Sequence, residues 1–151
     1  MTTDTDLIKL YSQRILALTT EIPHRGRLDA PQASVRHRAP LCGSNVTVDL
    51  DVTDGRISRF AQEVKACALG QAAAALMGQA IIGRTSAEVE AARDQLRAML
   101  KDGAPPPTGP FTGYDVLEPA RDYRNRHASI MLTLEATAQA MAEAERSSAC
   151  A

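Results

Sequence analysis

The sequence predicts an α+β domain in which a small antiparallel sheet of about three strands packs against about four helices. Residues 45–52 (NVTVDLDV) alternate strictly between apolar and polar side chains, as expected for a strand with one buried face. Asp54-Gly55 then predicts a tight turn into a second strand, because both central positions of a type I′ turn need positive φ. Ile57 and Phe60 can both face the core only if that strand bulges. Apolar residues after the hairpin recur at helical spacing, so helices follow the strands.

The segment before the hairpin predicts a helix, a loop and a short strand. A helix capped by Thr5 ends before Pro23, and residues 21–34 (EIPHRGRLDAPQAS) are rich in turn formers, which predicts a surface loop. A short strand is expected over 35–38, and the second hairpin strand over 57–65. The apolar stripe of the first helix consists of Leu7, Tyr11, Ile15 and Leu18.

The second half of the chain predicts three helices. Residues 66–83 are rich in alanine, which permits close packing, and Gly83 is a natural stop. Thr85 and Glu88 form a capping box for the next helix, and the three consecutive prolines in residues 102–110 predict a loop. The apolar stripe of the capped helix is Val89, Ala92, Leu96 and Met99.

A last helix is predicted to begin near Arg126. Its core-facing residues are Ile130, Met131, Leu134, Ala138 and Met141. The absence of a repeat or a composition break predicts one domain over residues 1–151, with a disordered tail from about residue 146.

Composition narrows the classes of partner. Of the 151 residues, 44% are hydrophobic and 23% charged, and the formal net charge of −1 argues against a nucleic-acid partner. The N-terminal segment has acidic residues where a secretory signal would be basic. The most apolar stretch, 66–82, is interrupted by Gln71 and Gln79, so it falls short of a membrane span. We therefore expect a cytoplasmic protein with no membrane partner.

Three cysteines, an odd number, make a disulfide framework a poor explanation and leave metal or thiol chemistry and simple burial as the alternatives. Cys42 lies in the loop before the strict strand, and Cys67 lies where the second strand ends and a helix begins. A hairpin returns to the end from which it started, so the two sulfurs can lie close together. The helix N-terminus also favours the thiolate of Cys67. Cys150 is interpreted as an incidental tail thiol.

The segments PLCGSNVTVDLDVTDGRI and VKACALGQAAAALM resemble, in order and content, the iron–sulfur cluster assembly scaffolds of the IscU/NifU/SufU type. LIKLYSQRIL with PHRGRL resembles the family's opening helix and loop, and RHASIMLTLEA resembles its final helix. The similarity covers about residues 6–143, so the resemblance implies the fold of the whole domain.

In that family, three cysteines and an aspartate hold a cluster or a zinc ion. Cys42 and Cys67 match the first and second cysteines, whereas Ser44 stands in the place of the aspartate and Ala128 in that of the third cysteine. His127, where many scaffolds have histidine, is the expected third ligand, and Ser44 is a weak fourth candidate.

The resemblance implies a scaffold that binds iron or a labile cluster of the two-iron, two-sulfur type, or zinc, and passes it to acceptor proteins. A cysteine desulfurase would supply the sulfur, and no catalytic residue is expected in the chain itself. Two alternatives stay open: a degenerate member that serves as a zinc-bound or metal-free regulatory module for the desulfurase, and a SufU-like sulfurtransferase. Self-association as a homo-oligomer is also left open.

Overall fold

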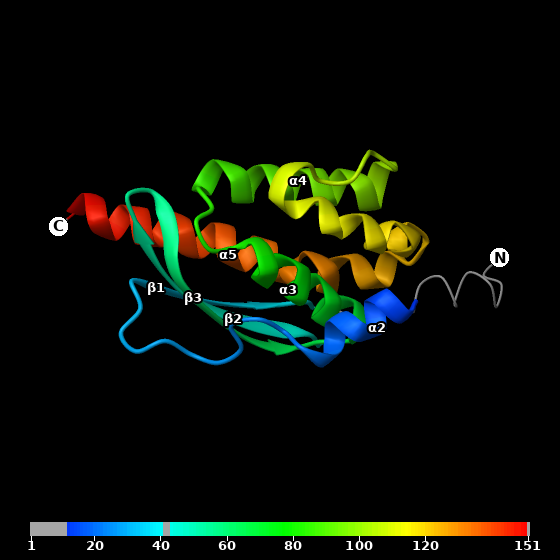
Figure 1. Cartoon of the computed structure of the whole chain (residues 1–151), viewed down its shortest axis with the longest axis horizontal. Coiled ribbons are helices and arrows are strands. Elements are labelled where there is room, and N and C mark those ends of the chain that lie inside the picture. Colours follow the sequence, from blue (N-terminus) through cyan, green and yellow to red (C-terminus); the bar gives the residue numbers. More distant parts are fainter. Residues whose placement is uncertain (1–11, 41–42, 151) are drawn as a thin grey trace.

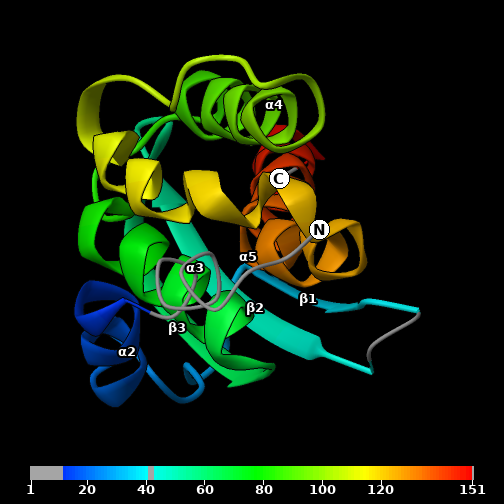
Figure 2. The same cartoon turned by 90° about the vertical axis from the view of Figure 1, so that its right-hand side faces the viewer.

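The structure is a computed structural model that describes residues 12–40 and 43–150, with side chains described as far as residue 147. A three-stranded antiparallel sheet, in the order β1-β2-β3, forms one layer (Figure 1). The helices α3 and α5 lie against one face of the sheet, and α4 and η1 form an outer layer over them (Figure 2). The predicted α+β class is therefore confirmed. The elements are α2 (Gln13–Thr20), β1 (Ala33–Arg38), β2 (Asn45–Thr53), β3 (Arg56–Lys65), α3 (Ala68–Ala80), α4 (Ser86–Asp102), the 3₁₀ helix η1 (Gly109–Asp122) and α5 (Arg124–Cys150).

The β2–β3 hairpin has the predicted turn and the predicted bulge. Asp54 and Gly55 both adopt positive φ, 54° and 76°, which is the backbone conformation of a type I′ turn. The register shifts next to Asp51, and this shift lets Ile57 and Phe60 both point into the core, where they are 1% and 4% exposed. The pairing brings the end of β3 beside the start of β2, with Lys65 opposite Asn45. The β1–β2 loop and the segment that leads into α3 therefore lie at the same end of the hairpin.

The segment between α2 and β1 lies over the outer face of the sheet. Its backbone pairs with β3, since the Gly26 N–H donates to the Gln62 carbonyl at 2.9 Å and the Gln62 N–H donates to the His24 carbonyl at 2.9 Å. The same segment covers Asp49, whose side chain is fully buried although it points away from the apolar core. The expected surface loop is therefore also the cover of a polar cluster on β2.

The helix signals of the sequence agree with the structure, apart from one element that was not predicted. Thr85 and Glu88 form the complete capping box of α4, and the Pro-rich residues 103–108 lie between helices. The structure adds η1, in which Phe111, Tyr114, Leu117 and Ala120 are buried. These four residues recur every third position, which is the period of a 3₁₀ helix with three residues per turn.

The structure tests the predicted start of the last helix but not the predicted cap of the first helix. At α2 the Ser12 side chain accepts a hydrogen bond from the Ile15 N–H, and the predicted cap Thr5 lies outside the described residues, as do Leu7 and Tyr11. The helix α5 starts at Arg124, close to the predicted start. The single domain over residues 1–151 and a tail that is disordered in solution stay predictions. No helix within the described part of the chain is long and apolar enough to cross a membrane.

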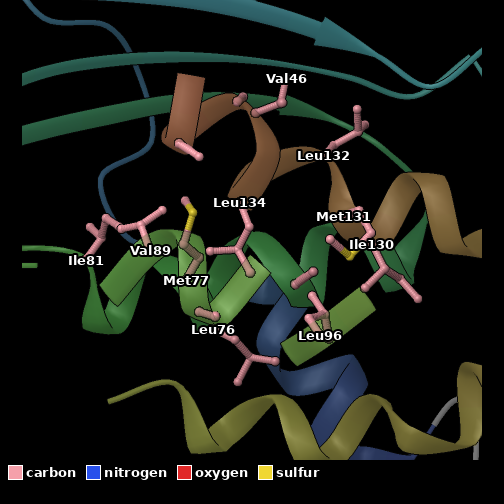
Figure 3. Close-up of a cluster of buried hydrophobic side chains, with 14 of the residues drawn as sticks. Val46, Leu76, Met77, Ile81, Val89, Leu96, Ile130, Met131, Leu132 and Leu134 are labelled. Atoms are coloured by element: carbon pink, nitrogen blue, oxygen red, sulfur yellow. The ribbon is translucent and has the colours of Figure 1, made fainter. Parts of the chain in front are cut away.

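The core is organised around α5 (Figure 3). Val46 of β2 lies on the sheet side of α5, and Leu76 and Met77 of α3 lie on the other side, with Leu134 of α5 between them. All four are buried, at 7% exposure or less. Because α5 contacts both the sheet and α3, the first turn of this helix can bring polar residues from distant parts of the chain together.

Candidate functional site

The loop between β1 and β2 is closed by its own backbone. The Ala39 N–H donates to the Ser44 carbonyl at 2.8 Å, and the Gly43 N–H donates to the Ala39 carbonyl at 3.2 Å. Gly43 has φ of 72°, a conformation that favours glycine, and Ser44 is only 4% exposed. Leu41 and Cys42 lie outside the described residues. The loop that carries Cys42 therefore has fixed ends, and Ser44 is buried at one of them.

Cys67 occupies the N-cap position of α3 and is half-buried. Its side chain makes no capping hydrogen bond, so the sulfur is available to other partners. The Cys67 Sγ lies 3.5 Å from the Ser129 Oγ in the first turns of α5.

Ser129 connects Cys67 to the β1–β2 loop. Its side chain is buried, with the residue 1% exposed, and its hydroxyl donates to the Ser44 Oγ at 3.0 Å. A serine hydroxyl carries one proton, so with that proton directed at Ser44 the Cys67 thiol is the donor in the contact with Ser129. The three side chains form a continuous chain of neutral hydrogen-bonding groups that joins the loop of Cys42, the start of α3 and the start of α5.

Close approach of α3 and α5 holds this cluster together. A Cβ atom added to Gly70 of α3 would lie 2.5 Å from the Ser129 Oγ and 2.8 Å from the Ala66 Cβ. Both distances are shorter than real Cβ contacts, so a larger residue at position 70 would force the Ser129 hydroxyl and Ala66 to shift. Gly70 thus sets the distance between the helix that begins at Cys67 and the helix that carries Ser129.

His127 is 9% exposed and is anchored by the end of η1. Its Nε2 lies 3.0 Å from the Ala120 carbonyl oxygen and 3.0 Å from the Arg121 carbonyl oxygen. Carbonyl oxygens only accept, so Nε2 carries a proton, and in the neutral ring the lone pair is on Nδ1. Histidines that bind metals commonly hold their other ring nitrogen in this way. His127 could therefore act as a ligand only through Nδ1.

The described residues alone do not complete a metal site. Within residues 12–40 and 43–147, no three histidine, cysteine, aspartate or glutamate side chains lie close enough to hold a metal ion. The cluster supplies one sulfur, from Cys67, and two hydroxyls, and neutral hydroxyls bind zinc or iron far less well than thiolates do. The donor set thus fits a cluster or a zinc ion only together with Cys42 from the adjoining loop.

Ser129 was not identified from the sequence, although a signal for it exists. Ser129, Thr133 and Thr137 recur at intervals of four along α5, and all three are buried. A stripe of hydroxyl residues on the buried side of a helix indicates contacts with other elements. Here Ser129 contacts Ser44 and Cys67, and Thr137 contacts Met77 of α3. The sequence could have marked the stripe, but it could not have shown that Ser44 and Cys67 meet Ser129.

The carboxylates of β2 are engaged elsewhere. Asp49 accepts hydrogen bonds from Arg27 Nε at 2.7 Å, Ser34 Oγ at 2.6 Å and the Leu28 N–H at 3.1 Å. Burial alone would raise the pKa of Asp49, but these hydrogen bonds and the Arg27 charge outweigh it and hold the pKa below its ordinary value. Asp49 is consequently a charged group whose two carboxylate oxygens are both engaged by Arg27, Ser34 and Leu28, away from the cysteine cluster.

The two remaining histidines lie outside this cluster. His24 is exposed and packs edge-on against Phe60, and His37 contacts the Gln139 side chain. The side chain of Cys150 is outside the described part of the chain. Neither histidine contributes an atom to the contacts described between Ser44, Cys67 and Ser129.

The model of the NifU-like N terminal domain family matches residues 10–130 of the chain. The chain belongs to this family. Its fold is similar to that of a nitrogen-fixing NifU-like protein (N-terminal) from Brucella abortus, with 42% sequence identity and a TM-score of 0.91 over 93% of this chain and 98% of that one. The family resemblance expected from the sequence is thereby confirmed.

One further relative is similar in sequence, and one further solved structure is similar in fold. The iron-sulfur cluster assembly scaffold protein IscU of Thermotoga maritima is 32% identical over 80 residues, which are 53% of this chain and 56% of that protein, just over half its length. A putative iron-sulfur cluster assembly scaffold protein for the SUF system from Fervidobacterium islandicum has the same fold, with a TM-score of 0.80 at 19% identity over 89% of this chain and 98% of that one.

Proposed function

We propose that this protein is an iron–sulfur cluster assembly scaffold whose cargo, iron or a labile cluster of the two-iron, two-sulfur type, is held at the junction of the β1–β2 loop, α3 and α5. The observation that carries the proposal is the contact chain from Ser44 through Ser129 to Cys67. It joins the two segments that bear the family's first and second cysteines. Family membership supports the same function.

In this proposal Cys42 and Cys67 supply the thiolates, and His127 supplies the Nδ1 nitrogen. Mixed sulfur and nitrogen ligands suit both tetrahedral zinc and clusters in which histidine replaces cysteine. Ser129 holds the Ser44 end of the loop against Cys67 and so limits how far the two cysteine segments can separate. Ser44 itself replaces an acidic ligand by a neutral hydroxyl, which leaves a weakly held coordination position that suits a cargo passed onward.

The partners follow from the same chemistry. A cysteine desulfurase would supply sulfur, and acceptor proteins would receive the cluster, in the cytoplasm. Zinc is the alternative occupant, since thiolate and imidazole ligands also bind it well.

A second candidate function is favoured by the neutral groups at the site. With Ser44 and Ala128 where the family has an aspartate and a cysteine, a zinc-bound or metal-free module that regulates the desulfurase needs no cluster. A SufU-like sulfurtransferase that uses one of the two cysteines is the remaining alternative.

Anaerobic reconstitution with iron and sulfide separates these functions. We expect the wild type to take up iron and to absorb in the visible range, and we expect Cys42→Ser and Cys67→Ser to lose most of both signals. Cys150→Ser, which changes the tail cysteine, is the matched control and should behave as wild type. Uptake of zinc without iron would support the regulatory module, and uptake of neither metal by the wild type would contradict the scaffold.

A further inference from the structure

A basic pocket lies on the helical side of the molecule, next to the cysteine cluster, and His127 is one of its lining residues. It has a volume of about 890 Å³ and opens between the C-terminal half of α4, the end of η1 and the first turns of α5. Its walls carry four side chains that are cationic at neutral pH: Arg97, Lys101, Arg121 and Arg124. They come from three different elements, so the positive charge surrounds the opening and is not confined to one helix face.

The pocket keeps a positive excess after its own carboxylates are counted. Arg97 Nη2 pairs with Glu135 Oε2 at 3.3 Å, and this pair neutralises both groups. Within the described part of the chain Lys101, Arg121 and Arg124 make no ion pair, and only Asp122 opposes them among the lining residues. Three positive charges against one leave an excess of two in a chain whose formal net charge is −1.

The guanidinium of Arg121 lies close to Gly103, the C-cap residue of α4. Gly103 has φ of 70°, and a Cβ added there would lie 3.3 Å from Arg121 Nη1. The backbone of Gly103 thus leaves room for the guanidinium at the wall of the pocket. The Arg121 carbonyl oxygen also anchors the ring of His127, so the backbone of this residue is held as well.

The lining also includes apolar residues. Leu100 of α4 and Met131 of α5 line the pocket and are largely buried, at 3% and 5% exposure, while Lys101 and Arg124 are exposed. An apolar centre with a charged rim is typical of a surface that binds another protein. A compact inorganic anion would use only the charges, and a nucleic acid would need a much larger positive surface than this chain offers.

We propose that this pocket docks an acidic segment of a partner protein, with carboxylates against Lys101, Arg121 and Arg124 and an apolar side chain against Leu100 and Met131. The inference does not rest on the proposed function, because the charge of the pocket is independent of what Cys67 binds. A partner docked in this pocket would lie beside the site formed by Ser44, Ser129 and Cys67. Ala128 lines the pocket and its neighbour Ser129 contacts Cys67, so the first turns of α5 border both sites.

Fluorescence anisotropy with a labelled EELEEL peptide tests this surface on the metal-free full chain. We expect the wild type to bind the peptide, with affinity that falls as ionic strength rises. Charge reversal by Lys101→Glu with Arg124→Glu should weaken binding by about tenfold or more, because both contacts become repulsive. A QQLQQL peptide should not bind measurably.

The matched control is Arg36→Glu with Arg38→Glu, which makes the same charge change at exposed positions on β1. This control should keep wild-type affinity, and the thermal unfolding midpoints of both double variants should stay close to that of the wild type. Equal loss in the two double variants would overturn the proposal, since it would show a general charge effect. Equal binding of the glutamine peptide, or no binding by the wild type, would overturn it as well.

Discussion

Two buried polar clusters adjoin β2, and they differ in chemistry. The first surrounds Asp49 on the outer face of the sheet, where a carboxylate is paired with Arg27 and takes further hydrogen bonds from Ser34 and a backbone N–H. The second begins at Ser44, just before the strand, and continues through the Ser129 hydroxyl to the Cys67 sulfur. Both join segments distant in sequence, but the first is built on an ion pair, whereas the contacts described in the second join two hydroxyls and a sulfur.

The comparison teaches how a polar cluster that stabilises the fold differs from one suited to binding. Every donor around Asp49 is matched to a lone pair of its carboxylate. Loss of any of these partners leaves a buried charge incompletely paired, which costs a large desolvation free energy. Hydroxyls and a thiol can exchange donor and acceptor roles at small cost, since each is weakly bonded. The contacts among Ser44, Ser129 and Cys67 can therefore be rearranged at a lower cost than those of Asp49.

The largest expected effect is the loss of stability in Asp49→Asn. The neutral amide keeps only one acceptor oxygen for Arg27, Ser34 and the Leu28 N–H, so the free energy of unfolding should fall by about 2 kcal/mol at pH 7. Urea denaturation measures this. Asp51→Asn is the matched control on the same strand, and because Asp51 is less buried its loss should be smaller.

The pH dependence of Asp49→Asn sharpens this prediction. The pKa of Asp49 is lowered in the folded protein, so the carboxylate stabilises the fold fully above its unfolded pKa of about 3.9. That contribution is lost as the pH falls through the lower folded pKa. The difference in stability between wild type and Asp49→Asn should therefore shrink in acid, and a difference that grew in acid would contradict the assignment.

A smaller effect on stability, but a specific one on binding, is expected for Ser129→Ala. Loss of the hydrogen bond to Ser44 and of the weak contact with Cys67 should lower the free energy of unfolding by about 1 kcal/mol. After anaerobic reconstitution, the half-life of bound iron in the presence of a chelator should shorten several-fold, because the Ser129 hydroxyl no longer ties the β1–β2 loop to Cys67. Visible absorption measures this half-life.

Thr133→Val is the control for Ser129→Ala. Thr133 is buried one turn further along α5, and its replacement keeps the shape of the side chain while removing the hydroxyl. It should leave iron retention unchanged. If both variants release iron equally fast, the effect of Ser129 is general packing and the comparison between the two polar clusters fails.

Local signals explain which parts of the fold the sequence could predict. The Asp54-Gly55 turn and the capping box of Thr85 and Glu88 depend on residues a few positions apart, and the structure confirms both. The helix η1 was missed because its apolar residues follow a period of three rather than of 3.6. Short-range patterns were sufficient wherever the period was that of a regular strand or α-helix.

The candidate site could be predicted only in part, for a different reason. Cys67 at the start of a helix follows from the local sequence, and the structure agrees. The contact of Ser129 with Ser44 spans 85 positions and its contact with Cys67 spans 62, so only the packing of α5 against α3 creates them. The roles of Cys42, Cys67, His127 and Ser44 as ligands stay predictions.

X-ray absorption at the zinc edge of the zinc-loaded protein tests the central claim most directly, because it reports the atoms bound to the metal. The account predicts a sulfur shell at about 2.3 Å from Cys42 and Cys67, accompanied by nitrogen from His127. Cys67→Ser should halve the sulfur contribution, whereas Asp49→Asn should leave the spectrum unchanged. A wild-type spectrum with only nitrogen and oxygen neighbours would contradict the assignment of the cysteine cluster as the binding site.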